Sequence, residues 1–151
     1  MTLFADKAVL IMTPLVQNYG WKDFQAAAVA GNFGRETGGF QHLREAGQPP
    51  GRGGYGWAQW TGPRRASFLN YCSDHGLDWH TDEANMGYFA HELTTSYRFL
   101  PGIMKKTTDL HEAVSEFEHY YEGAGVVAMA DRYLWANRAL VAYRAHKERT
   151  A

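Results

Sequence analysis

The chain has little of what marks several protein classes. Its single cysteine, Cys72, has no partner for an intramolecular disulfide, which excludes a disulfide scaffold. The formal charge of −1 gives no electrostatic reason to expect nucleic acid as a partner. No apolar run approaches the ~20 residues that span a bilayer. The first residues also lack signal-peptide features, because Asp6 precedes the short apolar run Ala8–Met12 and Pro14 interrupts the apolar pattern.

Several catalytic motifs are absent as well. The sequence holds no Gly-x-Ser-x-Gly and no glycine-rich phosphate loop with a Lys-Ser/Thr pair at its end. One cluster of potential metal ligands exists, formed by His75, His80, Asp74 and Asp78, but its spacing fits no regular ligand pattern. We therefore expect no metal and no other cofactor, and acid–base chemistry by carboxylates remains.

The chain that is present reads as mostly helical, with one irregular insert. Its 151 residues suit one domain, spanning residues 1–151. The segment Gly38–Gly62 is rich in turn residues, with short strands at most around Phe40–Leu43 and Tyr55–Trp57. Apolar spacing, caps and breakers predict helices over Asp6–Tyr19 with a break at Pro14, Trp21–Arg35, Pro63–His75, Thr81–Tyr97, Asp109–Tyr121 and Val126–Lys147, with a chain break at Pro101-Gly102.

The alanine-rich segment Trp21–Arg35 is the predicted centre of the fold. Small side chains let neighbouring elements pack closely against it, so we expect it to lie in the core. The fold class is therefore mainly α, of the α+β kind: a helical bundle around a central helix, with a small irregular β/loop lobe that forms a cleft.

Glu36 stands at the end of that helix and is the main candidate for chemistry. The stretch Gly53-Gly-Tyr-Gly-Trp-Ala-Gln-Trp60 comes about twenty residues later. A carboxyl in apolar surroundings resists ionisation and can keep a proton for a leaving group near neutral pH. The alternative is an exposed acid at a helix end, which is the commoner place for glutamate.

The motifs resemble a known family. The stretch Gly31-Asn-Phe-Gly-Arg-Glu36-Thr-Gly38, together with Gly53-Gly-Tyr-Gly-Trp-Ala-Gln-Trp and Arg64-Arg65, is similar to the phage tail lysozyme family of the lysozyme-like superfamily. Tyr88–Leu93, Phe117–Glu122 and the pair Arg132 and Ala136 also match its later segments. The resemblance covers about residues 24 to 140 and implies a lysozyme-like fold.

This resemblance implies a role for each matching residue. Glu36 would be the general acid that protonates the bond between N-acetylmuramic acid and N-acetylglucosamine in peptidoglycan. A further similarity to goose-type lysozymes and lytic transglycosylases places Tyr55 and Gln59 beside the scissile sugar. Trp57, Trp60 and Tyr55 would offer flat apolar area to pyranose rings, although we expect at least one of the tryptophans to pack in the core.

The second catalytic group stays open at this stage. Glu45 is the first candidate, nine positions after the predicted acid, and an exposed loop acid is its alternative. Glu92 and Glu122 lie in matching segments, but for each a salt bridge to an arginine such as Arg132 or Arg64 is the favoured role. An enzyme with a single glutamate would favour lytic transglycosylation, in which the muramyl 6-hydroxyl replaces water.

The implied activity is that of a monomeric peptidoglycan muramidase, and we expect it to serve phage-driven lysis of the host cell. We expect synthesis in the host cytoplasm without a signal peptide, and action on the wall after holin release or as part of a virion. A chitinase-like enzyme, an interbacterial effector and a non-catalytic glycan-binding virion module are the alternatives. The basic segment Arg132–Arg149 could contact an anionic envelope weakly, or it could complement the acidic helix Asp109–Glu122.

Overall fold

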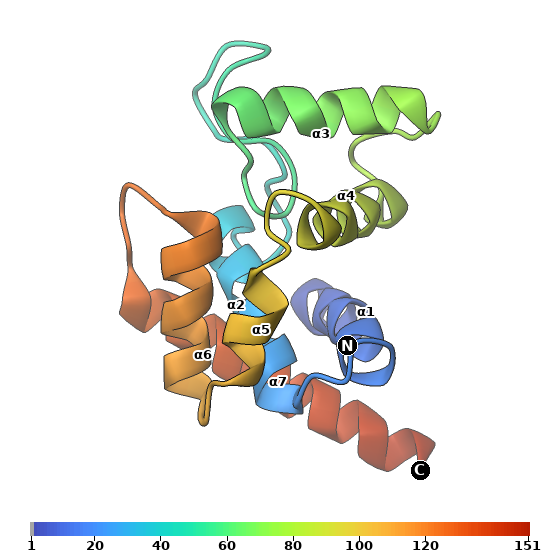
Figure 1. The fold of residues 1–151 in the computed structure, drawn as a ribbon, viewed down its shortest axis with the longest axis vertical. Helices are drawn as coiled ribbons and strands as arrows, with labels where there is room; N and C mark the ends of the chain where they lie inside the picture. The colour runs from blue at the N-terminus through green and yellow to red at the C-terminus, as the bar shows by residue number, and fades with distance from the viewer. Residues whose placement is uncertain (1) are drawn as a thin grey trace.

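The computed structural model describes residues 2–151, and helices account for most of them. Over these residues the only β pairing consists of isolated bridges, Arg44 with Tyr55 and Tyr55 with Trp60. The mainly α prediction is therefore confirmed. In chain order (Figure 1) the helices are α1 (Leu3–Gln17), α2 (Asp23–Thr37), α3 (Gly62–Asp74), α4 (Asp82–Thr94), α5 (Leu100–Lys105), α6 (Leu110–Phe117), the π-helical turn η1 (Glu118–Glu122) and α7 (Met129–Thr150).

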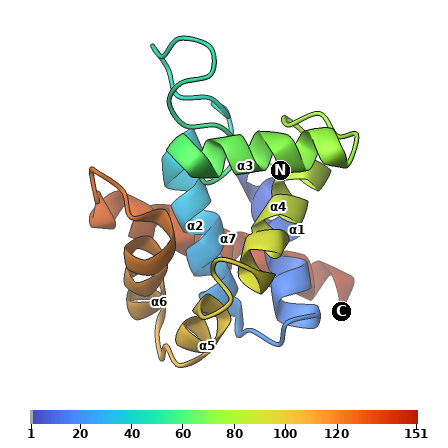
Figure 2. The ribbon, with the colours of Figure 1, turned by 45° about the horizontal axis from the view of Figure 1, so that its top comes forward.

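Helix α2 is the centre of the bundle, as predicted. Figures 1 and 2 show α1, α6 and α7 arranged around it, and α2 is buried from Gln25 to Gly34. Helix α7 crosses α2 at Gly31 with almost no space between the backbones. A Cβ atom at Gly31 would lie 2.4 Å from the backbone of Ala136. The small residues of α2 thus determine how closely α7 can approach, and α7 carries Arg132, a residue of the candidate site.

Two predicted breaks are absent. Helix α1 continues through Pro14, because burial of Ile11 and Leu15 in the core outweighs the hydrogen bond that proline removes. Pro101 lies in the first turn of α5, where its missing N–H costs nothing, so the expected chain break is a short helix.

The insert between α2 and α3 is irregular but tied to the body of the protein. The short strands predicted within it are reduced to the isolated bridges. The amide of Glu45 donates to the Gly54 carbonyl at 2.8 Å, and the amide of Gly56 donates to the Leu43 carbonyl at 2.7 Å. The amide of Trp57 donates to Asn85 Oδ1 on α4 at 2.9 Å. Figure 1 shows part of this insert projecting beyond α3, while its base is fixed against α4.

Candidate functional site

A hollow of about 270 Å³ opens where the end of α2, the insert, the turn after η1 and the start of α7 meet. Most of its charged lining residues are acids, and two arginines lie among them. These elements are far apart in sequence, so the hollow exists only in the folded protein. Its lining residues are Arg35, Glu36, Glu45, Ala58, Gln59, Thr61, Glu122, Gly123, Ala124, Gly125, Val126 and Arg132.

Glu36 lies in the last turn of α2 and is held by one arginine. Arg132 Nη2 donates to Glu36 Oε1 at 2.6 Å. The Arg132 side chain is 1% exposed, whereas that of Glu36 is 20% exposed. The other guanidinium nitrogens also form hydrogen bonds. Nε donates to the Val127 carbonyl at 2.6 Å, and Nη1 donates to Asn32 Oδ1 at 3.1 Å.

The predicted apolar surroundings of Glu36 are therefore wrong in one respect. The buried guanidinium of Arg132 faces its carboxyl group at 2.6 Å. Sequence reasoning linked Arg132 to Glu92 or Glu122 instead. The arginine fixes the position of the Glu36 side chain while leaving part of it open to the hollow.

Glu45 and Gln59 share the hollow with Glu36. Glu45 is exposed, and its Oε1 accepts a hydrogen bond from the Gly54 amide at 3.3 Å. Gln59 has a φ of +55°, which places it in the left-handed region. Its Nε2 donates to the carbonyls of Gly56 and Leu43 at 2.8 and 3.1 Å. The amide of Gln59 is thus oriented by the insert, and no hydrogen bond of the described residues uses its Oε1 as acceptor.

The three aromatic residues predicted to bind sugar lie elsewhere. Trp57 and Trp60 are each 1% exposed and belong to the core, so the expectation of at least one core tryptophan holds for both. Tyr55 is also buried, packs against Trp79 and accepts a hydrogen bond from the Gly51 amide at 2.9 Å. None of the three lines the hollow. Their part in sugar binding stays a prediction.

Glu92 has a structural role, as its expected arginine pairing indicated. Arg64 binds its carboxylate through both Nε and Nη2, at 3.0 and 2.8 Å. The hydroxyls of Tyr121 and Tyr88 donate to the same carboxylate at 2.5 and 3.2 Å. Arg64 Nη1 also donates to the Tyr121 carbonyl at 2.8 Å. This buried network links α3, α4 and η1.

Glu122 does not have the structural role predicted for it, which was a salt bridge to an arginine. No ion pair with an arginine forms within residues 2–151, and its buried Oε2 has no hydrogen-bond partner there. Burial raises the pKa of Glu122 well above its usual value, and the neighbouring Glu36 raises it further. The hollow therefore holds two carboxyl groups in contrasting surroundings: Glu36 is paired with Arg132, whereas Glu122 forms no ion pair within the described residues.

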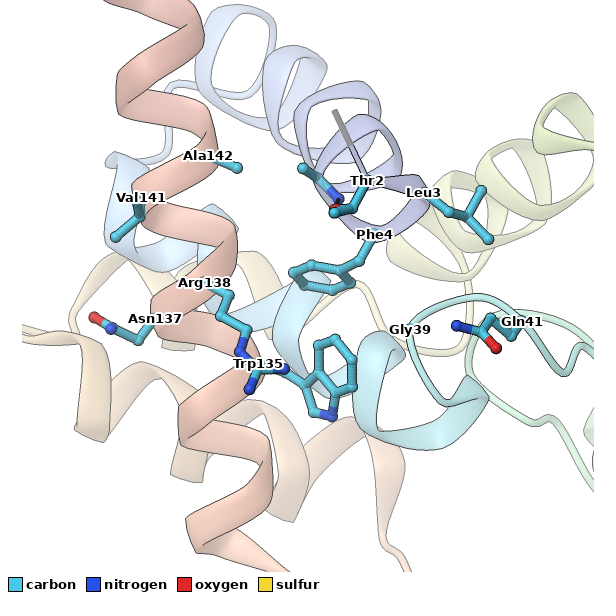
Figure 3. Close-up of a pocket in the computed structure, with 11 residues that line it drawn as sticks. Thr2, Leu3, Phe4, Gly39, Gln41, Trp135, Asn137, Arg138, Val141 and Ala142 are labelled. Atoms are coloured by element: carbon cyan, nitrogen blue, oxygen red, sulfur yellow. Dashed lines mark hydrogen bonds between the residues drawn. The ribbon is translucent and has the colours of Figure 1, made fainter.

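A larger hollow lies on another face, between the start of α1 and the middle of α7 (Figure 3). Its volume is about 550 Å³, and Phe4 and Trp135 are among its lining residues. No aspartate, glutamate or histidine lines it. Of these two hollows, the smaller one around Glu36 is the one lined by carboxyl groups.

Within residues 2–151, no three histidine, cysteine, aspartate or glutamate side chains come together as a metal site would require. The candidate ligands His80 and Asp78 only pair with each other, at 2.7 Å. None of the helices in the described part of the chain has both the length and the apolar content to cross a membrane.

Comparison with known proteins adds the family. The family model described as phage tail lysozyme matches residues 6–143. A search of curated proteins found no match. Because the family match covers nearly the whole chain, this protein belongs to the phage tail lysozyme family, which indicates a peptidoglycan-lytic, lysozyme-like function.

Proposed function

We propose that this protein is an N-acetylmuramidase that hydrolyses the β-1,4 bond between N-acetylmuramic acid and N-acetylglucosamine. Glu36 is its general acid. The observation that carries this proposal is the position of Glu36: a partly exposed carboxyl on the central helix, facing a hollow and held at 2.6 Å by a buried arginine. Family membership supports peptidoglycan as the substrate.

The geometry supports a role for each neighbour in the reaction. Protonation of the glycosidic oxygen turns Glu36 into a carboxylate, and Arg132 stabilises that charge as it develops. The fixed orientation of Arg132 means that little reorganisation accompanies the transfer. Gln59 Oε1 can accept a hydrogen bond from a sugar hydroxyl or acetamido N–H, because the amide nitrogen of the same side chain is anchored.

The second half of the reaction needs a base. After the leaving sugar departs, the Glu36 carboxylate can accept a proton from the water that attacks the anomeric carbon. Two other carboxyl groups, Glu45 and Glu122, line the same hollow, and their presence favours hydrolysis over transglycosylation. Released fragments that end in 1,6-anhydro-N-acetylmuramic acid would overturn hydrolysis.

A zymogram tests the proposal. Purified wild-type protein and the Glu36→Gln variant are compared on gels that contain sacculi, with Glu148→Gln as the matched control at an exposed site on α7. We expect clearing by the wild type and the control and none by Glu36→Gln. Chitin oligomers are the second substrate, and cleavage of these without cleavage of sacculi would favour a chitinase-like enzyme. Muropeptide binding without turnover by the wild type would favour a glycan-binding module.

The biological setting is part of the proposal. The protein is made in the host cytoplasm and acts on the wall, either after holin release or as part of the virion. The family description, which names the phage tail, supports the virion-associated form. Mass spectrometry of purified virions distinguishes the two: peptides of this chain in washed particles support a virion component, and their absence supports a lysis enzyme.

A further inference from the structure

Glu122 occupies the end of an unusual local structure. Helix α6 does not simply end but widens into the π-helical turn η1 (Glu118–Glu122), which closes at Gly123 with a φ of +52°. π-Helical turns are rare and are found frequently at functional sites. The preceding residue, Tyr121, is held by Glu92, Arg64 and Trp60. Because these contacts fix Tyr121, the η1 turn holds the next residue, Glu122, in place at the hollow.

The carboxyl group of Glu122 is left without a partner. Its Oε2 is buried and has no hydrogen bond within the described part of the chain. Buried polar atoms in folded proteins are nearly always paired, so each exception calls for an explanation. A purely structural glutamate, such as Glu92, has both oxygens satisfied by several donors.

The charged side chains near Glu122 come from several different elements of the fold. The nearby arginines are already committed, Arg132 to Glu36 and Arg64 to Glu92. Within its own turn, Glu118 Oε2 accepts a hydrogen bond from the Ala124 amide at 3.0 Å. These groups are Glu36 of α2, Arg64 of α3, Glu118 of η1 and Arg132 of α7, with Arg35 and Glu45 on the lining of the same hollow.

We propose that Glu122 is a positioning residue that holds the catalytic proton for Glu36, so that the two carboxyl groups share one proton in the hollow. This inference rests on the proposed function. At rest Glu122 is the neutral acid and Glu36 is the carboxylate paired with Arg132. Burial raises the pKa of Glu122, and the negative charge of Glu36 raises it further.

The proton moves in two steps. In the first, the O–H bond of Glu122 breaks and an O–H bond forms on Glu36, while the negative charge passes from Glu36 to Glu122. In the second, the Glu36 O–H bond breaks and the glycosidic oxygen gains the proton as its bond to the anomeric carbon breaks. Water then adds to the anomeric carbon and returns one proton to the pair.

Glu45 is the competing residue for this role. It lines the same hollow but is exposed, and its carboxylate accepts a hydrogen bond from the Gly54 amide. Glu45 thus contacts solvent and has a hydrogen-bond donor, whereas Glu122 Oε2 is buried and has none within the described residues. We expect Glu45→Gln to leave the pH dependence of the reaction unchanged.

The test is the pH profile of kcat/KM on dye-labelled sacculi for the wild type and for Glu122→Gln, Glu122→Asp and Glu45→Gln. We expect the alkaline limb of Glu122→Gln to move to lower pH by about one unit, a roughly tenfold loss on that limb. KM should change less than about twofold, because Glu122 does not touch the substrate in this scheme. Glu122→Asp, which keeps a carboxyl, should lie between the wild type and Glu122→Gln.

Contrary outcomes are distinct from a failure of the proposed function. An unmoved alkaline limb in folded Glu122→Gln, with activity unchanged or lowered equally at every pH, overturns the inference. If Glu122→Gln does not fold, ¹³C NMR of the wild type decides: a Glu122 carboxyl that is ionised at pH 6 in the folded protein overturns it, and a neutral one supports it. Near wild-type activity of Glu36→Gln would instead overturn the proposed function itself.

Discussion

The ion pair between Glu36 and Arg132 can be measured by a double-mutant cycle. The variants are Arg132→Met, Glu36→Gln and the two combined, compared with the wild type. Methionine keeps much of the apolar volume of arginine and removes its charge and donors. Arg132→Met leaves Glu36 without its counter-ion and leaves Asn32 Oδ1 and the Val127 carbonyl without a donor.

The expected magnitude depends on burial and distance. Removal of one partner of a buried ion pair costs about 3–5 kcal/mol, and we expect Arg132→Met to fall in that range because Arg132 is 1% exposed. Only part of this loss of stability comes from the lost interaction between Arg132 and Glu36. Two charges about 4 Å apart interact by about 4 kcal/mol at an effective dielectric of 20. Because Glu36 is 20% exposed, we expect a coupling of about 2 kcal/mol.

Urea unfolding monitored by tryptophan fluorescence gives the four free energies of unfolding. The losses at Asn32 and Val127 are common to both backgrounds and cancel in the cycle. The slope of each transition must stay constant for the comparison to hold. A coupling below about 0.5 kcal/mol would refute the claim that the buried arginine holds Glu36 in place.

Three further predictions concern the close packing at Gly31, the titration of Glu122 and the effect of Glu45 on activity. Gly31→Ala should destabilise by about 1–3 kcal/mol, despite the better helix propensity of alanine, because its methyl group would meet Ala136 at 2.4 Å. Gly102→Ala, which has no neighbour within 4 Å, is the control, and a Gly31→Ala melting temperature at or above that of the wild type contradicts the close crossing. The raised pKa of Glu122 means that the folded state keeps a proton that the unfolded state releases, so wild-type stability should fall as pH rises above the unfolded value of about 4.3, by up to about 1.4 kcal/mol per pH unit. Glu122→Gln should lack that slope in urea titrations, and identical slopes would contradict the neutral state. Glu45→Gln should reduce activity on sacculi less than about tenfold if the residue only lines the cleft, whereas a loss of orders of magnitude would show that it positions water.

The central helix and the candidate acid were both accessible from the sequence. Small residues from Ala26 to Gly31 predicted the core position of α2, because only such residues allow another backbone to approach closely. The sequence also placed Glu36 at the end of that helix, although α2 continues to Thr37, two residues beyond the predicted end, before Gly38 adopts the left-handed conformation. Both features depend on neighbours in the chain.

The arginine partners of Glu36 and Glu92 could not be predicted from neighbouring residues in the same way. Arg132 lies 96 positions from Glu36, and the sequence offers several acids that could pair with Arg64 or Arg132. The crossing of α2 and α7 decides that Arg132 pairs with Glu36, and the packing of α3 against α4 decides that Arg64 pairs with Glu92. Glu122 is then left without an ion pair in the described part of the chain. The α7 arginine Arg144 likewise pairs with Asp23 at the start of α2.

The aromatic residues of the insert show a different limit. A glycine-rich stretch with tryptophans can present rings to a ligand or fold back on the core, and the pattern alone does not separate these outcomes. Here Trp60 packs against Phe68 on α3 and donates to the Tyr121 hydroxyl at 3.0 Å. The insert is thus anchored by its own aromatic residues, and polar side chains beside them line the hollow.

The rate and products of sacculus digestion by wild type and Glu36→Gln test the central claim most directly. With Glu148→Gln as control, the proposal predicts wild-type fragments that end in reducing N-acetylmuramic acid, and a rate for Glu36→Gln lower by at least about 100-fold. Folding of each variant is checked by circular dichroism. A Glu36→Gln rate within about tenfold of the wild type, with the same products, would contradict the assignment of Glu36 as the general acid.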